Sequence, residues 1–196
     1  MNTLFPIEPV LPQGFTYHPD FISKEEEIRL VEEINNTPLT PFIFQGYEAK
    51  RRVASFGYDW NFEKQILTKG KDIPTVFFWL IDRVAEQLTI EKTTIAELLI
   101  TEYTEGTVIN WHRDAPPFDT IAGISLLSDC IFKLKPHDKQ LQSKKAIFSF
   151  PVKRRSLYIM QGEARSAWQH SIAAVKHTRY SITLRTLRTN SFTTVQ

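Results

Sequence analysis

The residues best suited to chemistry in this sequence are histidines that stand two positions before an aspartate. This spacing occurs at His18-Pro19-Asp20 and at His112-Arg113-Asp114. The second triplet follows a strand-like run at residues 108–111, and alternate residues of a strand share a face. His18 precedes a proline in a segment without such a run. The pattern therefore predicts that His112 and Asp114 bind one metal ion.

A metal site at this position needs a further ligand from a distant part of the chain. His170 lies in a strand-like run at 167–172, whereas His177 lies in a short connection, and a rigid strand positions a ligand better than a loop. Two histidines and one carboxylate leave three coordination positions open, as in non-haem Fe(II) oxygenases. The alternative is that His112 and Asp114 form an exposed pair and that His170 is a hydrogen-bonded core histidine.

A second group of polar residues lies on the last strand-like run. In the segment RYSITLR, Arg179, Ser181, Thr183 and Arg185 share one face. These side chains are costly to bury without partners. A dianionic ligand would supply partners, because the planar fork of arginine matches a carboxylate. The alternative is the exposed polar face of an edge strand.

These motifs together resemble the AlkB branch of the Fe(II)/2-oxoglutarate-dependent dioxygenases. The segment RYSITLR (179–185) is the most specific match. LLITEYTEGTVINWHRD (98–114) resembles the Asn-x-Tyr stretch of the family, with Tyr103 matching and Thr101 in place of the asparagine. RRSLYIMQGEARSAWQH (154–170) resembles the strand pair before the distal histidine, and with FISKEEE (21–27) it looks closest to the tRNA-modifying homologues.

The resemblance implies a set of roles for the site residues. Iron would be held by His112, Asp114 and His170, and 2-oxoglutarate would be bound by Thr101, Tyr103, Arg179, Ser181 and Arg185. Arg179 would pair with the distal carboxylate beside Tyr103, and Arg185 would lie near the chelating end. Dioxygen would oxidise the co-substrate to succinate and carbon dioxide while a C–H bond of the substrate is hydroxylated. Hydroxylation of an N-methyl group would release formaldehyde and restore the base.

The expected substrate is an alkylated or modified base in DNA, RNA or tRNA. RRVASFGYDW (51–60) is similar to the nucleotide-recognition region of the family. Its cations and aromatic rings suit an extruded base. The residues expected to contact substrate are Arg51, Arg52, Phe56, Tyr58, Trp60 and Trp111. The alternative is an ordinary strand in which Phe56, Tyr58 and Trp60 form one core face.

Charge is distributed unevenly along the chain. Residues 1–132 hold 11 Lys/Arg and 20 Asp/Glu, whereas residues 133–196 hold 13 Lys/Arg and two acidic residues. The basic part favours a nucleic acid partner, although such a run is also common in a solvated loop. Two further hypotheses are an oxygenase acting on a protein side chain or small molecule, and a non-catalytic jelly-roll binding module.

The elements that must position these residues change in type along the chain. Two helices are expected, one after the capping-box pair Ser23 and Glu26 and one over 73–88. Eight strands are expected between residues 98 and 187. We therefore expect a mainly β protein with flanking helices (α+β), in which a double-stranded β-helix (jelly roll) has two N-terminal helices packed outside.

The remaining features concern organisation and location. We expect a single domain over 1–196, with a helical extension carrying the nucleotide-recognition region at about 1–97 and the catalytic core at about 98–188. The segment up to about residue 22 should run extended over the surface. The single cysteine, Cys130, excludes an intramolecular disulfide framework. No export or membrane segment is visible, so a cytoplasmic monomer without membrane contact is expected.

Overall fold

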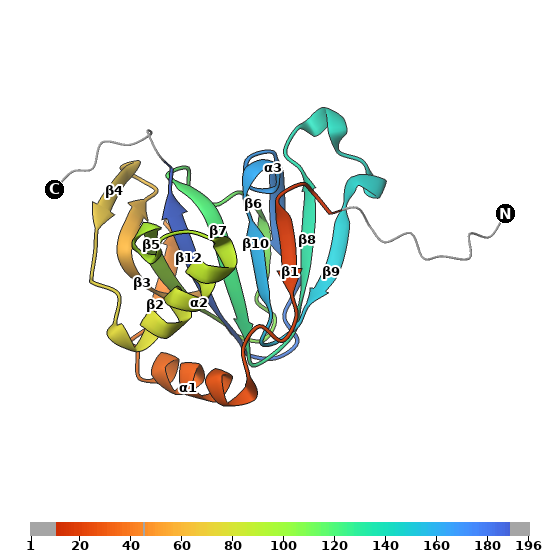
Figure 1. The fold of residues 1–196 in the computed structure, drawn as a ribbon. Coiled ribbons are helices and arrows are strands. Elements are labelled where there is room, and N and C mark those ends of the chain that lie inside the picture. Colours follow the sequence, from red (N-terminus) through yellow and green to blue (C-terminus); the bar gives the residue numbers. More distant parts are fainter. Residues whose placement is uncertain (1–10, 45, 189–196) are drawn as a thin grey trace.

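Strands dominate the structure, a computed structural model that describes residues 11–44 and 46–188 (Figure 1). They form two antiparallel sheets. In order, the major sheet contains β1 (Phe15–His18), β10 (Leu157–Met160), β7 (Phe118–Leu126), β12 (Arg179–Leu187), β5 (Ile95–Tyr103), β3 (Tyr47–Asn61) and β2 (Thr40–Phe44), and β4 (Ile66–Lys69) pairs with β3. The minor sheet contains β6 (Ile109–His112), β11 (Trp168–Ile172), β8 (Cys130–Pro136) and β9 (Phe148–Val152). This arrangement is consistent with the expected jelly roll.

The two longest helices of the described residues are α1 (Lys24–Asn35) and α2 (Phe78–Leu88). The capping box is present: the backbone N–H of Glu26 donates to the Ser23 hydroxyl, and that of Ser23 donates to the Glu26 carboxylate. A 3₁₀ turn (Thr75–Phe77) leads into α2, which ends at Thr89 in the left-handed conformation. The shorter helical elements are α3 (Gly162–Ser166) and the 3₁₀ turns Lys92–Thr94, Lys139–Leu141 and Lys144–Ala146.

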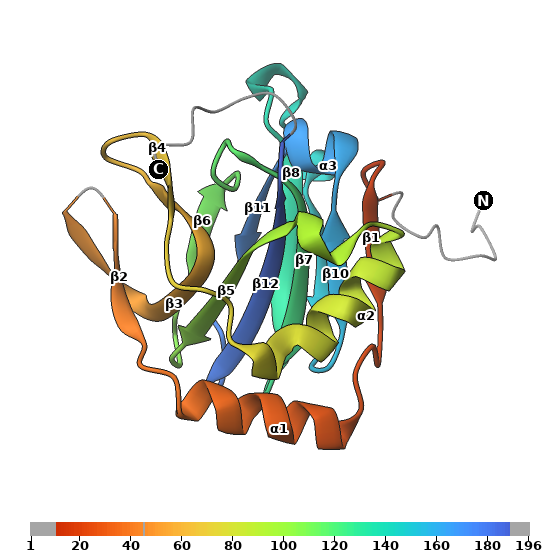
Figure 2. The same cartoon turned by 60° about the vertical axis from the view of Figure 1, so that its left-hand side comes forward.

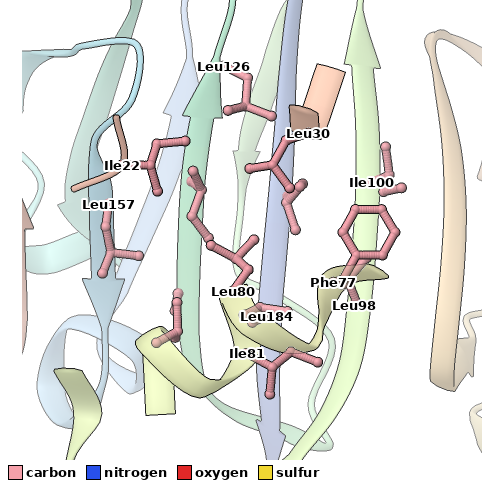
Figure 3. Close-up of a cluster of buried hydrophobic side chains, with 14 of the residues drawn as sticks. Ile22, Leu30, Phe77, Leu80, Ile81, Leu98, Ile100, Leu126, Leu157 and Leu184 are labelled. Carbon is pink, nitrogen blue, oxygen red and sulfur yellow. The ribbon is translucent and has the colours of Figure 1, made fainter. Parts of the chain in front are cut away.

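Two hydrophobic clusters lie on opposite faces of the major sheet. In the first, Leu30 of α1 and Leu80 of α2 pack with strand residues such as Leu98 and Leu184 (Figure 3). Helix α2 lies across the face formed by β5, β12 and β7, and α1 runs below it (Figure 2). The second cluster joins the two sheets, and Phe132 of β8 is buried there. The polar site lies on this second side, where the minor sheet covers the major one.

The N-terminal half contains more strand than the sequence predicts. Residues 15–18 do not run free over the surface, because β1 pairs with β10 along its whole length. The expected helical extension also contains β2, β3 and β4, which lengthen the major sheet. Residues 1–10 of the expected extended segment lie outside the described residues. Among the residues that are described, no helix has the length and apolar character needed to cross a membrane.

Strand β3 changes its face at Gly57. This residue has φ +84°, and a Cβ there would lie 2.1 Å from the carbonyl oxygen of Ala96. Only glycine adopts this backbone so close to a neighbour without strain. Phe56 consequently packs on the helix side of the sheet, whereas Tyr58 and Trp60 pack on the side of the minor sheet.

Candidate active site

The strands β6 and β11 bring two histidines together from distant parts of the chain. His112 and His170 are direct cross-strand partners, with ring centroids 4.2 Å apart. Asp114 follows β6, and its Oδ2 lies 3.6 Å from Nε2 of His170. One potential ligand atom from each of the three residues lies within 4.8 Å of the others. The three side chains are therefore placed to hold one metal ion.

The surroundings of the histidines leave them in the form that binds metal. Nδ1 of His112 donates to the carbonyl oxygen of Asn110 at 2.8 Å, which leaves the lone pair on Nε2. The ring of His170 stacks on Phe132 at 5.3 Å. Burial lowers the pKa of His112, and burial together with His112 lowers the pKa of His170 to about 3. Both rings are thus neutral near pH 7.

The two oxygens of the Asp114 carboxylate have different surroundings: one contacts an arginine and the other faces the expected metal position. Nη2 of Arg185 donates to Oδ1 at 2.6 Å, whereas the buried Oδ2 has no hydrogen-bond partner among the described residues. Burial alone would raise the pKa of Asp114, but Arg185 acts together with the two histidines and Arg165, and their combined effect holds the pKa well below its usual range. An ionised, buried and unpaired oxygen fits a metal ligand.

Two buried charged residues that the sequence analysis missed support this centre. Glu97 accepts from Nη1 of Arg185 at 2.5 Å and from the Ser55 hydroxyl at 3.2 Å. The side chain of Arg165 is buried, and its Nη2 donates to the carbonyl oxygens of Asp114, Ala115 and Phe118. For Glu97, the sequence did contain a signal of a functional role, because it is a single charged residue inside an apolar run. Arg165 fixes the backbone that follows the metal motif.

The inner end of the site contains a fully buried arginine with unused donors. Nε of Arg179 donates to the Ser125 hydroxyl at 3.0 Å, and its guanidinium lies 4.8 Å from the ring centre of Tyr103. Nη1 and Nη2 of Arg179 have no hydrogen-bond partner among the described residues. The hydroxyls of Tyr103 and Ser181 lie 3.4 Å apart. Two unused donors on one buried guanidinium fit the carboxylate of 2-oxoglutarate.

A cavity joins these groups, and residues of the β2–β3 hairpin form part of its lining. It contains the three potential metal ligands, Thr101 and Tyr103 of the expected co-substrate set, and Arg185. The other lining residues are Phe42, Arg51, Val53, Leu99, Ile109, Ile121, Phe132, Tyr158, Ile172 and Thr183. Arg179 and Ser181 lie behind this lining, against Tyr103. The cavity thus holds both metal-binding and carboxylate-binding groups.

The residues expected to contact substrate do not gather in one place. Arg51 lines the cavity, where its guanidinium lies 4.0 Å over the ring of Phe42, and burial lowers its pKa. Arg52 points to the opposite face of β3, because successive strand residues alternate, and pairs with Glu102. Trp111 contacts Lys135 on the outer face of the minor sheet.

The aromatic residues of β3 also fail to form the single face expected from their alternation. Gly57 places Phe56 on the opposite side from Tyr58 and Trp60. None of these three side chains lines the cavity. Phe42 does line it, although the sequence analysis missed this residue, because its position depends on the pairing of β2 with β3.

The comparisons with known proteins agree with this geometry. The model of the 2OG-Fe(II) oxygenase superfamily matches residues 14–190. A curated relative from Mus musculus, "tRNA (carboxymethyluridine(34)-5-O)-methyltransferase ALKBH8", is 32% identical over 173 residues, which cover 85% of this chain and 25% of the relative. This chain therefore spans about a quarter of that protein's length. "Probable RNA/DNA demethylase ALKBH6" from Danio rerio is 25% identical, with 84% of this chain and 71% of the relative covered.

A solved structure shows the same fold. The structure of OsALKBH1 has a TM-score of 0.70 at 13% sequence identity, with 92% of this chain and 100% of that chain covered. The family expected from the sequence is thus confirmed by the family model and the relatives. This chain belongs to the 2OG-Fe(II) oxygenase superfamily, as an AlkB-like dioxygenase that uses Fe(II), 2-oxoglutarate and dioxygen.

Proposed function

We propose that this protein hydroxylates or oxidatively demethylates alkylated or modified bases of DNA or RNA, including tRNA. The observation that carries the proposal is the cavity itself. One wall contains His112, Asp114 and His170, and the opposite wall presents Arg51 stacked on Phe42. A flat cation and an aromatic ring facing a metal centre suit a base turned out of its stack.

The metal ligands in this proposal are His112, Asp114 and His170. When bound, Fe(II) with 2-oxoglutarate and dioxygen supplies the oxidation of a substrate C–H bond, with succinate and carbon dioxide as products. Phe132 holds the His170 ring by stacking, and Asn110 fixes the tautomer of His112. These contacts keep both ring nitrogens directed at one point without rearrangement.

The co-substrate is assigned to the row of residues that leads inward from the metal ligands. Arg179 would donate from its two unused Nη groups to the distal carboxylate, and the hydroxyls of Thr101, Tyr103 and Ser181 would supply further polar contacts. Arg185 lies at the chelating end, where its Nε is the donor without a partner. Burial of these donors excludes water and strengthens their contacts with the carboxylate.

The substrate-recognition role falls on the N-terminal half in this proposal. Residues 1–97 contribute the β2–β3 hairpin with Arg51 and Phe42, and residues 98–188 form the catalytic core. Ile43 and Tyr47 of the hairpin are 62% and 73% exposed, which leaves apolar surface on the same hairpin as Arg51 and Phe42. Such surface suits the flat face of a base beside the extruded one.

For location and assembly, the prediction remains a cytoplasmic monomer.

The outer face of the minor sheet supports a nucleic acid partner. Lys133 and Lys135 of β8 point away from the buried face, and Lys135 lies 4.7 Å from the ring centre of Trp111. Neither lysine forms an ion pair with a described carboxylate. β6, which carries Trp111, also carries His112 of the cavity. Basic and aromatic groups on this outer face can bind phosphates and stack on bases.

Product analysis tests the proposed reaction. Protein loaded with Fe(II) is incubated with 2-oxoglutarate and methylated DNA, methylated RNA, tRNA or no substrate, and both succinate and formaldehyde are measured. We expect succinate release to rise with at least one nucleic acid, and Asp114→Ala to abolish it. If succinate forms at the same rate with every nucleic acid and without substrate, a protein or small-molecule substrate is favoured instead. If the protein binds no metal, a non-catalytic module is favoured.

A salt series tests the nucleic acid partner separately from the chemistry. The double variant Lys133→Glu/Lys135→Glu should weaken nucleic acid binding and flatten its dependence on salt, because fewer counterions are released. Lys92→Glu is a matched control, since Lys92 pairs with Asp82 of α2 on the helix side. Equal binding by the double variant and wild type would exclude the outer face as the contact surface.

A further inference from the structure

Tyr158 of β10 occupies the space that a side chain at Gly123 would need. The two residues are direct cross-strand partners between β10 and β7. A Cβ added at Gly123 would lie 2.2 Å from Cζ and 2.5 Å from the hydroxyl oxygen of Tyr158. The phenol therefore lies flat across β7 with its hydroxyl end above Gly123. This arrangement is possible only because residue 123 lacks a side chain.

Tyr158 lines the cavity beside two residues of the strands that carry the expected co-substrate site. Gly123 pairs on its other side with Thr183 of β12, and both Thr183 and Tyr158 line the cavity. Ser125, which accepts from Nε of Arg179, lies two residues from Gly123 along β7 and faces the same side. Tyr158 and Arg179 thus face the same side of β7, and they lie close enough for each to affect the pKa of the other.

The Tyr158 ring is held rigidly in this position. It stacks parallel to Phe15 with centroids 6.4 Å apart, and it contacts Phe132 at 4.9 Å. The residue is 7% exposed, and burial raises the pKa of Tyr158 above its usual value. The hydroxyl therefore stays protonated and can donate a hydrogen bond to an anion.

We propose that Tyr158 is a further co-substrate-binding residue that also sets the length of the 2-oxo acid. Its hydroxyl donates to the carboxylate held by Arg179, and its ring closes the slot above Gly123 against acids longer than 2-oxoglutarate. The inference rests on the role proposed for Arg179 and is independent of the nucleic acid substrate.

Co-substrate binding to the Mn(II)-loaded protein tests the hydroxyl. In calorimetric titrations, Tyr158→Phe should raise the dissociation constant of 2-oxoglutarate about tenfold, as expected for loss of one hydrogen bond to a charged group. The affinity for Mn(II) should not change, which separates this effect from damage to the fold. Tyr17→Phe is the matched control: Tyr17 pairs with Tyr158 across β1 and β10, and its hydroxyl accepts from the backbone N–H of Lys153.

A longer co-substrate tests the ring. Tyr158→Leu should admit the six-carbon homologue 2-oxoadipate and lower the preference for 2-oxoglutarate, measured as a ratio of kcat/KM, at least tenfold. The proposal is overturned if Tyr158→Phe binds 2-oxoglutarate as tightly as wild type, or if Tyr158→Leu keeps the wild-type preference. An unchanged 2-oxoglutarate affinity in Arg179→Gln would instead overturn the assignment of the distal carboxylate site, so the two failures are distinguishable.

Discussion

Arg185 and Asp114 are joined by a 2.6 Å contact between Nη2 and Oδ1, which leaves Oδ2 as the one unpaired oxygen of that carboxylate. The arginine therefore determines which oxygen faces the two histidines. A carboxylate held in this way can offer a single, oriented oxygen to a metal ion. The charge of Arg185 is in turn shared with Glu97, so three buried charges act together.

Replacing the metal carboxylate by its amide tests the first part of this relationship. Asp114→Asn keeps the shape of the side chain but removes the charge that a divalent cation needs. We expect Mn(II) or Fe(II) affinity, measured by anaerobic calorimetry, to fall at least about 100-fold, the upper end of the usual cost for supporting contacts of a metal site. Asp119→Asn, an exposed change on β7, is the control. Equal metal affinity in Asp114→Asn and wild type would contradict the assignment.

Glu97 provides a second prediction, because it balances the charge of Arg185 from the side away from the metal. Glu97→Gln leaves the whole arginine charge directed at Asp114, where it competes with the metal. We expect metal affinity to fall about tenfold and the free energy of unfolding to fall by about 3–5 kcal/mol, the cost of breaking a buried pair. Metal titration and urea unfolding measure the two effects.

Glu102→Gln is the matched control for Glu97→Gln. Glu102 lies on the same strand and also pairs with an arginine, but its partner Arg52 is 52% exposed and lies on the other face of the sheet. We expect a loss below about 1 kcal/mol in this variant and unchanged metal affinity. If both variants bind metal equally well, Glu97 acts only in stability.

The buried Arg179 gives a third prediction. Arg179→Gln removes two charge-assisted contacts to the distal carboxylate of 2-oxoglutarate. Each such contact contributes about 1.5–3 kcal/mol, so we expect the dissociation constant of 2-oxoglutarate to rise about 100-fold or more. Metal affinity should be retained, because Arg179 contacts none of the three metal-binding side chains. Arg52→Gln changes the same residue type outside the cavity and should leave both affinities unchanged.

The pKa of His170 predicts how the stability of the metal-free protein depends on pH. Burial lowers this pKa from 6.5 to about 3. The unfolded chain therefore takes up a proton near pH 6.5, whereas the folded chain does so only near pH 3. His170 thus lowers the free energy of unfolding as pH falls from about 6.5 to about 3, by about 1.4 kcal/mol per pH unit.

Urea unfolding of the metal-free protein at pH 7, 5 and 4 measures this slope. His170→Gln does not titrate, so its stability should fall less steeply over the same range than that of wild type. His18→Gln, which changes a half-buried histidine at the end of β1 outside the cavity, is the control and should follow wild type. Parallel curves for His170→Gln and wild type would contradict the prediction.

The sequence was sufficient where the site depends on local spacing. His112 and Asp114 stand two residues apart at a strand end, and the period of two put Arg179 and Arg185 on one face. These local patterns were enough to identify the family. What could not be predicted depends on which strands become neighbours. Glu97 reaches Arg185 because β5 pairs with β12.

A single backbone conformation explains the main error about the recognition region. The alternation of Phe56, Tyr58 and Trp60 predicted one aromatic face, but the left-handed φ of Gly57 breaks it. The sequence alone does not distinguish a glycine within a regular strand from one that marks a bulge. Arg51 lies before this point and still faces the cavity.

The pairing of His112 with His170 has a consequence for the assembly of the molecule. β6 is one of the two edge strands of the minor sheet and is hydrogen-bonded to β11. A metal ion bound by residues of both strands would cross-link β6 to β11 and so stabilise this edge of the sheet. Because such an ion binds only the folded chain, the melting temperature should rise with metal concentration. The iron centre would then contribute to the thermal stability of the protein as well as to catalysis.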